Sequence, residues 1–326
     1  MRLAISFRTI DWPSFSARMS RSPARLAASI GKLLLSGGLI GYLLYHYGPD
    51  YARLESIDPV LCMMVMAIFV LQLALNTIRW RLILTYLTGT KLPYYRIFAI
   101  YYASTFFSQI LPSVGGDLVR VLYRRIINST FTSMAVSVLL DRGVAIASLL
   151  FIALSAASFL APFDPDHTVI RWVVFVAGSG LSAAYGGCLM LRALRHSRIW
   201  MSIPKWTRTL VVSGAWSISS PTGLCCLIPL SAVVHLLSFA TIYLAAHAVQ
   251  VPLTFLVVFA IGPVLVLAHV FPISIGGWGV REAAAVALLG MTGVDATSAL
   301  LVSIMFGVLL MLATLPGALF WLVLKE

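Results

Sequence analysis

Charged residues are scarce in this sequence. They make up 10% of the 326 residues, and acids are rarer than bases, with 11 Asp and Glu against 23 Lys and Arg. Because 60% of the residues are hydrophobic, the chain has too little polar surface to cover a soluble globule of its size. Its apolar runs repeatedly exceed about 18 residues, enough for a helix to cross a bilayer. The sequence therefore predicts an all-α polytopic membrane protein.

Further absences exclude several classes of site. The four cysteines lie in apolar runs without C-x-x-C spacing, and the six histidines lack H-x-x-x-H spacing, so we expect no disulfide framework, metal or cofactor. No G-x-x-x-x-G-K-[ST] nucleotide motif occurs, so any transport is expected to be passive or coupled to an ion or a potential. The excess basic residues lie between apolar runs, where they set topology and meet anionic lipid, and nucleic-acid binding is not expected.

The apolar runs predict the membrane topology. Windows of about 20 residues place six full spans near 28–47, 59–78, 131–160, 170–191, 222–248 and 296–323. Two shorter runs end at proline and paired glycines, which predicts two re-entrant broken helices within 97–125 and 253–290. The expected organisation is a basic arm (1–27), a first half (28–191), a basic interfacial connector (192–221) and a second half (222–326).

The charge distribution then predicts the orientation. If both short runs are re-entrant and both termini are cytoplasmic, most basic residues fall inside, among them Arg79 and Arg81 in a loop after the second span, and most acids fall outside. The first break would open to the cytoplasm and the second to the outside. The two halves would thus form an inverted repeat, an architecture that supports alternating access.

A glycine motif occurs once in each half. SVGGDLVR at 113–120 recurs as SIGGWGVR at 274–281. Paired glycines permit an unwound turn, and the helix that restarts there directs free N–H groups into the break, a favourable place for phosphate. The arginine closing each motif has the geometry to hold a phosphodiester. The alternatives are that the breaks are packed kinks, that Arg120 is a topology cation clustered with Arg124 and Arg125, and that Glu282 neutralises Arg281 structurally.

Asp141 and Arg142 lie in the middle of the apolar run 131–161. Ionisable residues there are costly unless they face the bundle interior or a wet cavity, so the pair is a candidate functional site. Adjacent helical residues point about 100° apart, so each needs another partner. The options are Arg281 or Arg120 for Asp141, and Asp117 or Glu282 for Arg142. The alternative is a static salt bridge between helices.

The candidate substrate-binding residues comprise both motifs, the intramembrane pair and the acid after the second motif. They are Ser113, Gly115, Gly116, Asp117, Arg120, Asp141, Arg142, Ser274, Gly276, Gly277, Gly279, Arg281 and Glu282. Because Asp117 stands where the second copy has Trp278, we expect the first break to be the more polar one.

Three segments, LPSVGGDLVR, LLDRGVA and FPISIGGWGVRE, together resemble the membrane domain of lysylphosphatidylglycerol synthase/flippase proteins, over about residues 30–323. The resemblance aligns the family's Pro-x-x-Gly-Gly break with Pro112, Gly115 and Gly116, and its Asp-Arg pair with Asp141 and Arg142. It implies a bacterial inner-membrane protein that moves aminoacylated phospholipid between leaflets; stand-alone members are associated with polyprenyl-linked or hopanoid lipids. The synthases carry a soluble C-terminal catalytic domain that this sequence lacks, so aminoacyl transfer is not expected.

We therefore expect a lipid flippase-like transporter rather than an enzyme, with membrane lipids and lipid-biosynthesis enzymes as partners. In this interpretation the arginines meet the lipid phosphate, and Asp117, Asp141 and Glu282 meet any cationic part. One alternative is a membrane-embedded transferase acting on lipid-linked substrates, with Asp141 or Glu282 as general base. Another is an accessory scaffold of a lipid-synthesis complex. The lipid, the direction and the oligomeric state stay open.

Overall fold

The chain folds into helices throughout the part that its structure, a computed structural model, describes. That part comprises residues 34, 37–39, 41–48, 55–111, 115–194, 200, 202–270 and 277–324, and it contains no strand. The longer helices are α4 (Pro59–Thr88), α7 (Phe131–Ala156), α8 (Thr168–Leu194), α11 (Ile228–Ala248) and α14 (Ala296–Thr314). The shorter ones are α5 (Tyr94–Ile110), α6 (Gly115–Leu122), α10 (Lys205–Ser219), α12 (Phe255–Val270), α13 (Val280–Gly290) and α15 (Gly317–Val323).

Four described segments are long and apolar enough to cross a membrane. They are Pro59–Thr88, Phe131–Phe163, Gly223–Ala248 and Ala296–Val323, and they coincide with four of the six predicted spans. The apolar part of α8, Thr168–Ala183, is shorter, and much of 28–47 lies outside the described residues. The structure thus confirms an all-α chain with several membrane-length helices, whereas the total of six spans and the inverted repeat stay predictions.

Helix α4 extends beyond the predicted end of its span. The Asp58 side chain caps its start by accepting the Val60 N–H at 2.8 Å, and Gly89 ends it in the left-handed region with φ 68°. Arg79 therefore lies inside the helix with 4% of its surface exposed. The prediction that the helix ends before Arg79 is wrong, because a hydropathy window ends at the first charge whereas a buried partner allows the helix to continue.

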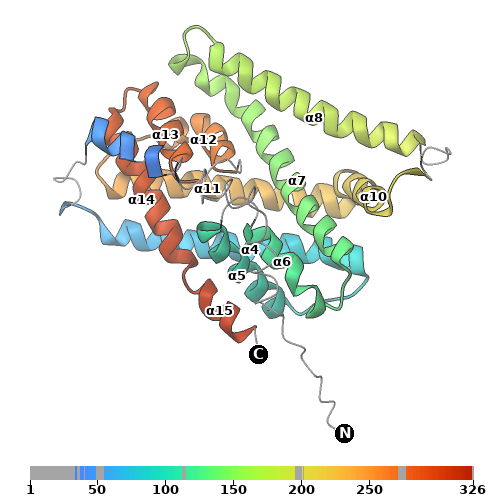
Figure 1. Cartoon of the computed structure of the whole chain (residues 1–326). Helices are drawn as coiled ribbons and strands as arrows, with labels where there is room; N and C mark the ends of the chain where they lie inside the picture. The colour runs from blue at the N-terminus through green and yellow to red at the C-terminus, as the bar shows by residue number, and fades with distance from the viewer. Residues whose placement is uncertain are drawn as a thin grey trace.

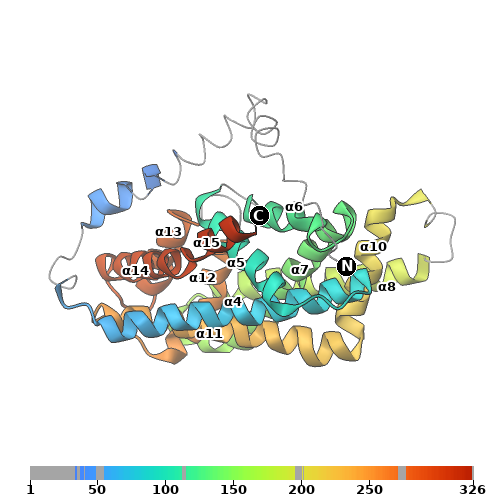
Figure 2. The same ribbon diagram turned by 90° about the horizontal axis from the view of Figure 1, so that it is seen from below.

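Helices α4, α7 and α11 pack against one another at the centre of the fold. Helices α4 and α11 lie side by side along its length, and α7 packs across both of them (Figures 1 and 2). Helix α8 packs on α7, and α14 packs on α4 and α13. The largest buried apolar cluster joins α4, α7, α11, α12, α13 and α14 through side chains such as Phe69, Leu149, Phe239, Ile261 and Leu301. This core holds the six helices around the cavities described below.

A short helix precedes each glycine motif and another begins within or just after it. Helix α5 ends before 111–114 and packs on α6, which begins at the glycines, whereas α12 ends before 271–279 and packs on α13. Three candidate residues, Ser113, Ser274 and Gly276, lie outside the described residues. That the pairs α5–α6 and α12–α13 are re-entrant elements within a bilayer stays a prediction.

The predicted connector 192–221 contains α10. This helix packs on α7, and its Trp216 ring stacks on the Tyr86 ring of α4 with 3.8 Å between centroids. Trp206, at the other end of α10, is exposed. The interfacial placement of this helix stays a prediction.

Candidate functional site

Asp141 lies at the centre of a buried ion-pair network. Its Oδ1 accepts from Nε of Arg79 at 2.7 Å, and its Oδ2 accepts from Nη1 of Arg120 at 2.9 Å. Arg79 stands nine residues before the end of α4 and Asp141 ten residues after the start of α7. At about 1.5 Å per residue, Arg79 lies about 14 Å from the end of α4 and Asp141 about 15 Å from the start of α7, so both lie well inside their helices. The predicted pairing of Asp141 with Arg120 is present, and Arg79 is an additional partner.

Asp117 continues the network on the other side of Arg120. It accepts from Nη2 of Arg120, and its Oδ2 accepts from Nε of Arg142 at 3.0 Å, which is one of the two pairings predicted for Arg142. Helix α6 lies outside the four candidate spans; burial alone would raise the pKa of Asp117, but Arg120 and Arg142 outweigh it and hold that pKa below its usual value. Three arginines thus share two aspartates, leaving one excess positive charge.

Aromatic rings cover the guanidinium group of Arg120. Its Cζ lies 4.5 Å from the centroid of Tyr101 and 5.4 Å from that of Trp80, distances at which cation–π attraction is appreciable. Arg120 is only 2% exposed. The alternative that Arg120 is a topology cation is therefore wrong, because the carboxylates and rings draw it into the bundle.

Arg281 and Glu282 form a second, separate cluster. Glu282 Oε1 accepts from Nε of Arg281 at 3.0 Å, while Oε2 accepts the Gly279 N–H at 2.6 Å and caps α13. Ser303 on α14 donates to the same carboxylate at 3.3 Å. The options that pair Arg281 with Asp141 and Glu282 with Arg142 are therefore wrong, and the structure agrees with neutralisation of Arg281 by its neighbour.

The two motif arginines have similar surroundings. Arg281 lies 4.5 Å from the ring centroid of Trp278 and 5.6 Å from that of Phe306, so each motif arginine is stacked on two rings. Trp278 and Asp117 occupy equivalent motif positions, three residues before the arginine, and both contact it. In the first motif Asp117 contacts the arginine as a carboxylate. In the second motif Trp278 contacts it by stacking, and Glu282 supplies the carboxylate.

The glycines meet different demands in the two breaks. Gly277 and Gly279 have φ of 79° and 88°, in the left-handed region that favours glycine. Gly116 instead permits a close approach, because an added Cβ would overlap the Ser108 hydroxyl and the Ser104 carbonyl oxygen. The Ser104 hydroxyl also donates to the Gly116 carbonyl at 2.7 Å. Gly116 therefore joins α5 tightly to the helix that carries Asp117 and Arg120.

Replacing Gly116 by alanine is expected to destabilise the protein by about 1–3 kcal/mol, the usual cost of overpacking. The measurement is the free energy of unfolding of the purified protein in detergent. Gly178→Ala in α8 is the matched control, since an added Cβ there meets nothing within 4 Å. Equal stability of the two variants would contradict the close approach.

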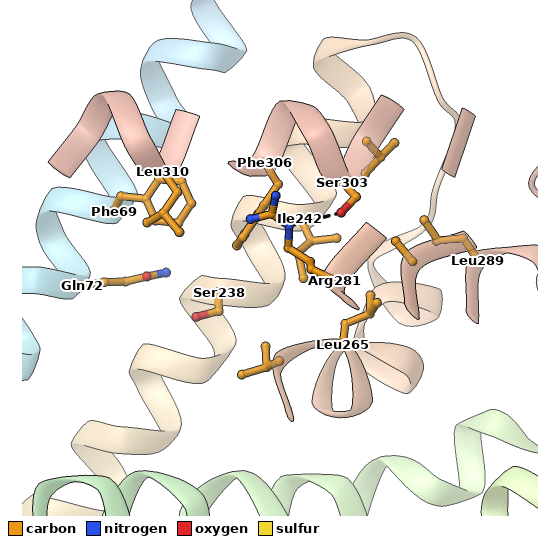
Figure 3. A pocket seen from close by; sticks show the side chains of 13 residues that line it. Phe69, Gln72, Ser238, Ile242, Leu265, Arg281, Leu289, Ser303, Phe306 and Leu310 are labelled. Carbon is orange, nitrogen blue, oxygen red and sulfur yellow. Dashed lines mark hydrogen bonds between the residues drawn. The ribbon is translucent and has the colours of Figure 1, made fainter. Parts of the chain in front are cut away.

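Two cavities lie beside these clusters. The first, about 170 Å³ and mostly apolar, is lined by Phe69, Gln72, Ser238, Ile242, Leu265, Val266, Arg281, Ala285, Leu289, Val302, Ser303, Phe306 and Leu310 (Figure 3). The second, about 180 Å³ and more polar, is lined by Phe69, Gln72, Leu73, Asn76, Tyr101, Ser104, Thr105, Ser108, Gln109, Arg120, Arg142, Leu310 and Thr314. Phe69, Gln72 and Leu310 line both cavities, so the two cavities adjoin each other. The cavity beside the first motif is the more polar one, although neither Asp117 nor Trp278 is among the residues that line the two cavities.

Helix α4 carries a polar stripe that was not predicted. Gln72, Asn76 and Arg79 are spaced four and three residues apart, so they share one helix face. Gln72 and Asn76 line the polar cavity, and Arg79 binds Asp141. Polar residues at helical spacing within an apolar span were a usable signal, because side chains of this kind in a membrane helix face the bundle interior.

These features define a polytopic helical membrane protein with a charged site buried between its helices. The sequence matches the family model described as the lysylphosphatidylglycerol synthase TM region over residues 29–317. Since the match covers most of its length, the chain belongs to this family, as its motifs indicated. Among curated proteins none matches the chain. Family membership and the apolar helices fit a membrane protein related to lipids.

Proposed function

We propose that this protein is a flippase-like transporter that moves a headgroup-bearing lipid between the leaflets of a bacterial inner membrane, with both termini cytoplasmic. The main support for this proposal is that buried arginines line two adjoining cavities, one polar and one apolar, between membrane-length helices. Arg120 and Arg142 offer guanidinium groups to a lipid headgroup. The acyl chains would stay in the bilayer.

The environment of the carboxylates favours transport over a transferase reaction. A general base must reach the proton that it abstracts. Asp141 is 1% exposed and engaged by two arginines, and Glu282 is fully buried and engaged by Arg281 and the Gly279 N–H. Neither carboxylate therefore suits the role of general base. A scaffold, in contrast, has no need for arginines beside a cavity.

Arg142 provides the test of this proposal. Its side chain is 46% exposed and lines the polar cavity, so Arg142→Gln is expected to leave folding largely intact while slowing lipid movement about tenfold, the equivalent of one charge-assisted hydrogen bond. The measurement is transbilayer movement of fluorescent anionic lipids in vesicles containing the purified full chain. Arg96→Gln, which changes an exposed arginine of α5 outside both cavities, is the control.

The outcomes separate the proposed functions. Wild-type protein that moves no anionic or aminoacylated lipid would refute the transporter. A product formed by purified protein from a lipid-linked substrate, and lost in Asp141→Asn with folding retained, would favour the transferase. If deleting the protein gives a cellular phenotype, rescue of that phenotype by Arg142→Gln but not by variants that fail to fold would favour a scaffold.

A further inference from the structure

Arginines face both cavities, whereas carboxylates do not. The described lining includes Arg120 and Arg142 in the polar cavity and Arg281 in the apolar one, and contains no Asp or Glu. The acids form ion pairs with these arginines and do not line the cavities themselves. A bound molecule would therefore meet positive charge without a free carboxylate.

The same cavities are bordered by hydrogen-bond donors that lack acceptors. Within the described chain, Nε of Arg120, Nε2 of Gln72 and Nη1 of Arg281 are buried and have no partner. Gln72 and Arg281 point into the apolar cavity from α4 and α13 (Figure 3), and Gln72 and Arg120 also line the polar one. Because buried donors without acceptors are unfavourable, these atoms suit a ligand that brings acceptor oxygens.

Helix α5 adds a group of hydroxyls to the polar cavity. Ser104, Thr105 and Ser108 each donate their own proton to a backbone carbonyl, at 2.7, 3.0 and 3.0 Å. Their oxygen atoms keep lone pairs that accept hydrogen bonds from a ligand. Asn76 Oδ1 is a further acceptor that has no partner within the described residues. The wall thus suits the hydroxyl groups of a polyol or sugar.

We propose that this site selects an anionic lipid whose headgroup is otherwise uncharged and hydroxylated, and that it disfavours a headgroup bearing an ammonium group. The inference rests on the proposed function and narrows its substrate. It also revises the expectation that Asp117, Asp141 and Glu282 would meet a cationic part, because their oxygens are already occupied by arginines and backbone. An ammonium group would instead approach the arginines and be repelled.

Competing lipids test this selectivity. The purified full chain is placed in phosphatidylcholine vesicles that contain a trace of fluorescent phosphatidylglycerol or fluorescent lysylphosphatidylglycerol. We expect phosphatidylglycerol to move about tenfold faster or more, the effect of one unfavourable charge contact. Equal or faster movement of the lysyl lipid would overturn the selectivity and leave transport standing. If neither lipid moves, the transporter proposal fails, and selectivity is decided by which lipid better protects the protein from thermal unfolding.

Substitutions at Gln72 test whether this side chain contacts the lipid or only stabilises the fold. Gln72→Leu removes a buried amide that has no described partner for Nε2, so the unfolding temperature is expected to stay level or rise while phosphatidylglycerol movement falls about fivefold or more, the loss of one hydrogen bond. Gln72→Glu adds a carboxylate to the wall and is expected to shift the rate ratio toward the lysyl lipid. Unchanged rates and an unchanged ratio in both variants would overturn the role of this side chain.

Discussion

Replacing Asp141 by asparagine is expected to lower the free energy of unfolding by about 3–5 kcal/mol, the cost of removing one partner from a buried ion pair. Asp141 forms ion pairs with Arg79 and Arg120 at once, at 2.7 and 2.9 Å. All three side chains are buried, so water cannot replace the lost carboxylate. Chemical unfolding of the purified protein in detergent measures the change. Asp166→Asn, on an exposed loop residue, should be neutral.

A second substitution identifies which arginine is left without a counter-charge and so causes the loss of stability. In the Asp141→Asn protein, Arg120 keeps Asp117, whereas the described contacts leave Arg79 only the Ser231 hydroxyl at 3.1 Å. Adding Arg79→Gln should therefore recover more stability than adding Arg120→Gln, although both restore the net charge. Equal recovery would show that total charge governs the network rather than the individual contacts.

Replacing Glu282 by glutamine is expected to cause a loss of similar size, about 3–5 kcal/mol, because Arg281 would stay buried without a counter-charge. The carboxylate also accepts the Gly279 N–H at 2.6 Å, so the change weakens the cap of α13. A glutamine offers one oxygen where two are used. The midpoint of thermal unfolding in detergent, measured beside the exposed control Glu55→Gln, tests the prediction.

Removing both charges of the second cluster is expected to be milder than removing one. Arg281 packs on Trp278, Phe306 and Gly307, so a methionine at this position retains much of the apolar contact. The double variant Arg281→Met with Glu282→Gln should therefore unfold at a higher temperature than Glu282→Gln alone. A lower temperature would mean that the arginine stabilises α13 by contacts other than its pairing with Glu282.

Local patterns predicted the all-helical class of the fold and the positions of several long helices. Helices α7 and α14 begin at Phe131 and Ala296, where the predicted spans 131–160 and 296–323 begin. Prolines and paired glycines predicted two breaks, and described helices flank both positions. Asp141 and Arg142 were recognised because a charge in an apolar run needs a partner wherever the helix packs. Arg79 was misplaced, because hydropathy cannot distinguish a charge at the end of a span from one buried deep within a longer helix.

Composition, run length and glycine motifs are local properties of the sequence, and they were enough to establish an all-helical membrane protein. The tertiary structure decided which charges meet. Asp141 binds residues 62 and 21 positions away, and the register of α4, α6 and α7 against one another sets those pairings. The tertiary structure also turned the two motifs into unequal sites, one beside a polar cavity and one beside an apolar cavity, because the surrounding helices, more than the motif residues, supply the walls.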